Sequence, residues 1–176
     1  MVMRGMQGPG GGGSPRRALD TGKQFLADGV APGRRAWNAL MCAAAAAPDV
    51  AALADVFEAF KAAGETANSI THLALAHGAL VSGDTAAATE QLKTALALAP
   101  SLMGTPPPAN ADIPGTMARI VAAWAAGLPA GASVPGGTAG LAARTREALA
   151  AAGGGIPLDV DAAFAKTELV DGPLAA

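Results

Sequence analysis

Alanine content is the feature that most constrains the fold of this chain. Forty-seven of its 176 residues are alanine, only 3% are aromatic, and tyrosine is absent. Alanine has the highest intrinsic helix propensity, whereas strands favour the aromatic and β-branched residues of which this chain has few. The composition therefore predicts an all-α protein. Its core should be thin, because each alanine removes little apolar area from water and helices must approach closely to exclude solvent.

Apolar spacing and turn residues divide the chain into short helices. Gly29 and Gly64 are expected to close two of them as glycine C-caps, and Pro100 is expected to end the fifth. The predicted helices are residues 18–28, 36–47, 50–63, 69–81, 85–99, 116–127, 141–152 and 159–166.

Glycine and proline indicate how these helices are grouped. Residues 1–17 are predicted to be a flexible Gly-rich segment, and residues 104–115, which contain three consecutive prolines, a stiff linker. Between them lie helical repeats over 18–103, and beyond them a degenerate hairpin over 116–166 and a tail over 167–176. No apolar run approaches the roughly 18 residues that a membrane span requires, so no membrane partner is expected.

Two of the helix pairs are related by a regular shift. Gly29 and Gly64 lie 35 residues apart, and the same shift brings Phe25 onto Phe60. A period in this range is typical of stacked helical hairpins, none of which can bury its apolar face alone. The sequence therefore predicts an α-solenoid of helix-turn-helix hairpins.

Residues 34–68 resemble a pentatricopeptide repeat without a gap. The run Ala-Trp-Asn-Ala-Leu-Met at 36–41 stands where that family usually has Thr-Tyr-Asn-Thr-Leu-Ile. The run Val-Phe-Glu-Ala-Phe-Lys at 56–61 stands where it has Leu-Phe-Glu-Glu-Met-Lys, and Gly64 falls on its near-constant glycine. Residues 18–33 resemble the second helix and exit of a preceding repeat.

The next unit, residues 69–103, resembles two families equally. Ile70, Thr71 and Gly83 suit a pentatricopeptide repeat. The positions that a tetratricopeptide repeat fills with Leu, Gly, Gly, Ala, Phe, Ala and Pro are here Leu75, Ala76, Gly83, Ala88, Leu92, Ala95 and Pro100. Both families are built from helix pairs, so the alternatives differ in function and not in fold class.

Pentatricopeptide proteins bind single-stranded RNA in organelles, generally one base per repeat. The resemblance places the two base-reading residues at Asn38 and Asn68, whose amides each offer a donor and an acceptor. The alternative is that Asn38 caps a helix and Asn68 forms a turn. In the following unit Leu73 replaces the polar reading residue, so sequence-specific recognition by this chain alone is not expected.

The resemblance therefore implies a scaffold in an organellar ribonucleoprotein, such as a mitochondrial or chloroplast ribosome, that contacts RNA backbone and neighbouring proteins. The formal net charge is −2, but residues 1–35 carry six basic residues against two acidic ones. Phosphate contacts are predicted for Arg16, Arg17, Arg34 and Arg35, because charge suffices to position a protein on an RNA backbone. The alternative is a tetratricopeptide-like adaptor that binds proteins and no RNA.

Catalytic and metal-binding constellations are not expected. His72 and His77 are five residues apart, about 140° around a helix, and do not share a face. Cys42 is the only cysteine, so a zinc site of several thiolates is excluded and a small buried hydrophobe is expected. No serine has a nucleophile elbow, and the Gly-rich segment lacks the lysine of a phosphate-binding loop. The sequence predicts no enzyme, cofactor or small-molecule substrate.

Overall fold

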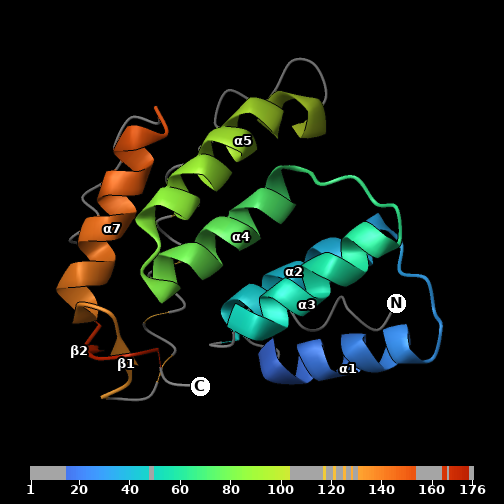
Figure 1. The fold of residues 1–176 in the computed structure, drawn as a ribbon, viewed down its shortest axis with the longest axis horizontal. Coiled ribbons are helices and arrows are strands. Elements are labelled where there is room, and N and C mark those ends of the chain that lie inside the picture. The colour runs from blue at the N-terminus through green and yellow to red at the C-terminus, as the bar shows by residue number, and fades with distance from the viewer. Residues whose placement is uncertain are drawn as a thin grey trace. The chain divides into compact units, whose positions relative to one another are not determined.

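A computed structural model describes residues 15–47, 50–103, 131–153, 164–165 and 167–174, together with residues 117, 121, 125 and 128. This described part is mostly helical, which confirms the fold class that the alanine content predicts (Figure 1). It divides into two compact units, Met1–Ala67 and Asn68–Ala176. Every helix in the described part is too short or too polar to cross a bilayer.

In the first unit α2 (Arg34–Ala46) packs against both α1 (Pro15–Ala27) and α3 (Val50–Ala62). Each helix begins and ends within three residues of its predicted bounds. A Cβ at Gly22 of α1 would collide with a terminal methyl of Leu40 of α2, so the Leu40 side chain packs directly on the backbone of α1. The apolar side chains less than 5% exposed in this unit include Leu19, Trp37, Leu40, Met41, Leu53, Val56 and Phe60.

An aromatic cluster joins α2 to α3. The ring of Trp37 meets Phe60 edge to face, with centroids 5.6 Å apart and planes at 89°. Phe57 stacks on Phe60 at 6.1 Å, and the Nζ of Lys61 lies 5.1 Å from the Phe57 ring centroid. Trp37 and Phe60 are buried and Phe57 is half-buried. The apolar face of this hairpin is therefore turned inward, as the repeat hypothesis requires.

The helix ends at Gly29 and Gly64 have the same hydrogen bonds. Both glycines have positive φ, of 74° and 72°. In each case the glycine N–H donates to the carbonyl three residues back, and the next N–H donates to the carbonyl of a phenylalanine, Phe25 or Phe60. This is the Schellman arrangement, in which a left-handed glycine satisfies the last carbonyls of a helix. Both predicted glycine C-caps are confirmed, at equivalent positions 35 residues apart.

The second unit is built on the hairpin of α4 (Ser69–Ser82) and α5 (Thr85–Met103), against which α7 (Gly137–Ala151) packs (Figure 1). Ala76, Ala88 and Ala95 have no exposed surface, so small side chains lie where the helices meet. Residues 117, 121 and 125, a Met, a Val and an Ala, are helical and buried at the spacing of one helix face.

Two predicted boundaries in this unit are wrong. Helix α5 continues past Pro100 to Met103. Proline removes one N–H and its ring crowds the carbonyl four residues back, but only three helical residues follow Pro100, so the disruption is confined to the end of the helix. Helix α7 begins at Gly137, four residues before the predicted start at Leu141. The Gly-rich sequence before Leu141 does not favour a helix. The early start of α7 is instead stabilised by hydrogen bonds from Gly136 and Thr138 to residues distant in the sequence.

The residues predicted to form a tail, 167–176, contain one strand of a short parallel pair. β2 (Val170–Asp171) pairs with β1 (Ser133–Val134), with Ser133 opposite Val170. The sequence gives no indication of this pair, because two-residue strands have no periodicity to detect.

Several predictions fall on residues outside the described part. They concern the Gly-rich residues 1–14, the Pro-rich linker at 104–115, most of the helix predicted at 116–127, and most of the helix predicted at 159–166. Of the last, Phe164 is described and is 3% exposed.

Candidate nucleic-acid interface

The first turn of α2 combines two arginines with an N-terminus that has no side-chain cap. Gly33 is the N-cap in an extended conformation, and no acidic residue lies in the first turn. Arg34 and Arg35 are exposed, and neither has an ion-pair partner in the part of the chain that the structure describes. Helix N-termini already carry a partial positive charge from the aligned peptide dipoles. This end of α2 is therefore a concentrated positive potential that a phosphate would neutralise.

Arg16 and Arg17 are also exposed, but they lie elsewhere on the first unit. They are in the first turn of α1, and the Nε of Arg16 is 3.6 Å from Asp20 Oδ1. Helices α1 and α2 run in opposite directions (Figure 1). At a rise of about 1.5 Å per residue, the 13 residues of α1 separate the starts of the two helices by roughly 15–20 Å along their axes. The structure brings the four predicted arginines together as two pairs and not as one patch.

The two predicted base-reading amides have different surroundings. Asn38 is half-buried on α2, one helical turn after Arg34 and Arg35. Asn68 is 6% exposed and is the N-cap of α4. Its Oδ1 accepts hydrogen bonds from the backbone N–H groups of Ile70 and Thr71, at 3.0 and 3.1 Å. Thr71 Oγ1 accepts in return from the Asn68 N–H at 3.3 Å, which completes a capping box.

Asn68→Ala should lower the free energy of unfolding by about 1 kcal/mol, because α4 loses its N-cap. Asn68→Asp should retain nearly the wild-type value, since a carboxylate caps equally well. Urea denaturation followed by circular dichroism measures both variants. A stable Asn68→Ala protein with weakened RNA binding would show that the amide reads a base and that its cap is dispensable.

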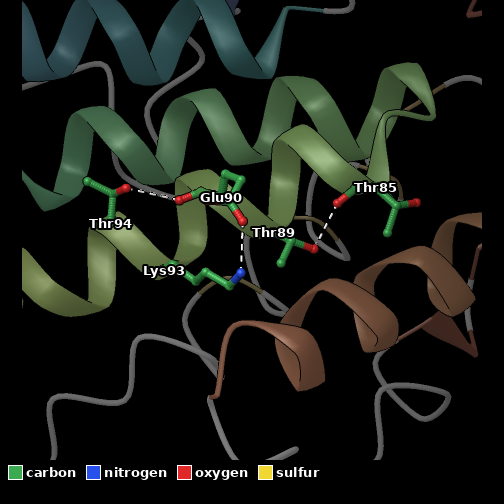
Figure 2. A network of polar contacts seen from close by, with 5 residues as sticks. All are labelled: Thr85, Thr89, Glu90, Lys93 and Thr94. Atoms are coloured by element: carbon green, nitrogen blue, oxygen red, sulfur yellow. Dashed lines mark hydrogen bonds and ion pairs between the residues drawn. The ribbon is translucent and has the colours of Figure 1, made fainter.

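Basic side chains on the other described helices are largely engaged with nearby acids. On the outer face of α5, Lys93 Nζ lies 2.8 Å from Glu90 Oε1 (Figure 2). Thr94 and Thr89 donate their hydroxyls to the carbonyls of Glu90 and Thr85, one turn back. Lys61 pairs with Glu58 in the same i, i+3 manner. Because these lysines already face a carboxylate, they attract phosphate less than Arg34 and Arg35 do.

The histidines and the cysteine are packed as structural residues. His72 Nδ1 lies 2.7 Å from Gln91 Oε1, which links α4 to α5. His77 is 2% exposed, and burial lowers its pKa to about 4. Cys42 is half-buried, and burial raises the pKa of its thiol. Among the described residues no three His, Cys, Asp or Glu side chains are grouped as metal ligands.

Arg144 is a structural residue that the sequence does not single out. Its Nε donates to the carbonyl of Leu80 at 3.1 Å, and its Nη1 donates to the carbonyl of Pro135 at 2.6 Å. Desolvation lowers the pKa of this guanidinium. The arginine thus joins α7 to the last turn of α4, where a cation favours the helix dipole. No sequence signal distinguishes it from Arg146, two residues on.

No model of a known protein family, no curated protein and no solved structure matches this chain.

Proposed function

We propose that this chain is a non-catalytic helical-repeat scaffold that binds RNA phosphates within an organellar ribonucleoprotein, such as a mitochondrial or chloroplast ribosome, and contacts neighbouring proteins there. The observation that carries the proposal is the first turn of α2, where Arg34 and Arg35 are exposed beside an uncapped helix N-terminus. Backbone phosphates are the groups that such a turn attracts most strongly. The proposed organellar location and the proposed ribosomal complex are based on the resemblance to pentatricopeptide proteins alone.

The repeat architecture has support in the helix ends. Gly29 and Gly64 terminate α1 and α3 with the same pair of hydrogen bonds and the same sign of φ. Equivalent ends 35 residues apart are what an α-solenoid of stacked hairpins requires. Solenoids as a class offer an extended surface and not a pocket, which would suit binding to a strand or a neighbouring subunit.

Binding should depend on charge and not on base sequence. The oxygen of Asn68 is engaged by two backbone N–H groups, so the proposal retains at most one base contact, from Asn38. One base contact, on the order of 1–3 kcal/mol, is too little to hold a strand. The proposal therefore assigns RNA contact to Arg34 and Arg35, with Arg16 and Arg17 as a second, separate pair of phosphate contacts.

Arg34→Glu with Arg35→Glu should weaken binding of a labelled single-stranded RNA by about tenfold or more at low salt. The slope of log K against log salt should also fall by about 1.4, because two phosphate contacts are lost. Fluorescence anisotropy over a salt series measures both quantities. The matched control is Lys61→Glu with Lys93→Glu, which makes the same charge change at two exposed lysines paired with acids.

Equal losses in the two double variants would mean that only net charge matters, and would refute the assignment to α2. Absence of salt-dependent RNA binding in the wild-type chain would refute the RNA proposal itself. The second candidate is then a tetratricopeptide-like adaptor for a protein segment. It is favoured by the α4–α5 hairpin, where three alanines without exposed surface, Ala76, Ala88 and Ala95, occupy positions that this family fills with small residues.

A further inference from the structure

The backbone N–H groups at the start of α7 donate to a segment 31 to 35 residues further along the chain. The first N–H groups of a helix have no partner within the helix and need one from outside. Gly136 is the N-cap of α7 and supplies no side chain. Its N–H donates to the carboxylate Oδ1 of Asp171 at 2.7 Å, and the N–H of Thr138 donates to the carbonyl of Leu169 at 3.3 Å. Residues 167–174, here termed the strap, therefore cap this helix.

The same helical turn holds the strap in return. Thr138 Oγ1 accepts from the N–H of Leu169 at 2.8 Å and donates to the carbonyl of Thr167 at 3.2 Å. Gly137 has a φ of +59°, and a Cβ there would lie 2.9 Å from the Leu169 carbonyl oxygen. The backbones of the strap and of the helix are thus in direct contact, so neither can move alone without losing hydrogen bonds.

On its other side the strap is tied to β1. The N–H groups of Val170 and Gly172 donate to the carbonyls of Ala132 and Val134, at 3.0 and 3.2 Å. Ser133 Oγ donates to the Pro173 carbonyl at 2.7 Å. Val170 is nevertheless 51% exposed, and both strands are only two residues long. Polar contacts with little buried apolar area characterise segments that open locally while the core stays folded.

We propose that the strap is a releasable latch that opens together with the first turn of α7 as one unit. Opening removes the acceptors of Gly136 and Thr138 at the same moment as it unpairs β2 from β1. Closure restores both sets of hydrogen bonds. The α4–α5 hairpin, whose contact is made by fully buried side chains, stays closed throughout.

Asp171→Ala in the full chain tests the latch by amide hydrogen exchange. Exchange should accelerate by about five- to tenfold at Gly136, Thr138, Leu169, Val170 and Gly172 together, because the loss of one cap weakens the whole unit. Amides of α5 should exchange as in the wild type. Asp171→Asn should behave like the wild type, because an amide oxygen also accepts the Gly136 N–H.

Glu168→Ala is the matched control, since it removes an exposed acid of the same strap. It should leave these rates unchanged. Thr138→Ala removes the two hydrogen bonds that the threonine hydroxyl makes with the strap. It should accelerate hydrogen exchange at the same group of amides. Acceleration confined to Gly136 in the Asp171 variant, or wild-type strap amides that exchange no faster than those of α5, would overturn the proposal.

Discussion

Trp37→Ala should lower the free energy of unfolding of the first unit by about 3–5 kcal/mol. Trp37 is 1% exposed, and its ring packs edge to face on Phe60 across the contact between α2 and α3. An alanine at this position leaves a cavity. The neighbouring side chains are mostly small and cannot fill it. Because a domain is stable by only about 5–15 kcal/mol, this single change should bring the unit close to unfolding.

The informative control is Trp37→Phe. The indole N–H of Trp37 is buried without a hydrogen-bond partner in the described part of the chain. Phenylalanine removes that N–H, whose burial is unfavourable, and retains an aromatic ring against Phe60. We expect a change within about 1 kcal/mol, because the smaller volume and the lost unsatisfied donor offset each other.

Urea denaturation followed by circular dichroism gives both free energies, and amide exchange in α2 and α3 localises the loss to the first unit. If Trp37→Ala cost less than about 1 kcal/mol, the aromatic cluster would not be the centre of this core. The repeat architecture would then lose the contact that joins the two helices of its best-matching unit.

The second large effect is a loss of stability in mild acid through His77. Burial lowers the pKa of this side chain from its ordinary value of 6.5 to about 4 in the folded chain. Between these values the unfolded chain binds the proton and the folded chain does not, so stability falls as the pH falls. This contribution to the free energy of unfolding is present above pH 6.5, and about 2–3 kcal/mol of it should be lost at pH 4.5.

His77→Gln isolates this contribution, because glutamine does not titrate. The difference in unfolding free energy between the wild type and His77→Gln should shift by about 2–3 kcal/mol between pH 7.5 and pH 4.5, in favour of the variant at low pH. His77→Leu provides a second non-titrating side chain if glutamine is poorly accommodated. A difference that does not change with pH in either variant would show that His77 is accessible to protons in the folded chain.

The structure places the predicted site residues in different surroundings. The sequence identifies Arg34 and Arg35 by charge and position, and the structure leaves both exposed at a helix start. For Asn68 the family pattern and the local chemistry suggest different roles, and the structure shows a buried cap. An N-cap can be assigned only where the first residue of the helix is known. Local sequence predicts that residue only to within a few positions. Whether Arg16 and Arg17 lie close to Arg34 and Arg35 depends on the relative directions of α1 and α2. Because these helices are antiparallel, the two pairs lie at opposite ends of the hairpin.

The helical class, the approximate bounds of α1 to α4 and the glycine ends are predictable from the sequence, because helix propensity, apolar spacing and left-handed glycine are local properties. The early start of α7, the pairing of β1 with β2 and the role of Arg144 arise from tertiary contacts and are not predictable from the sequence. Each depends on acceptors supplied by residues distant in the sequence: Asp171 lies 35 residues from Gly136, and Leu80 lies 64 residues from Arg144. The hydrogen-bonding needs of a helix end are local, but the groups that satisfy them come from the folded chain.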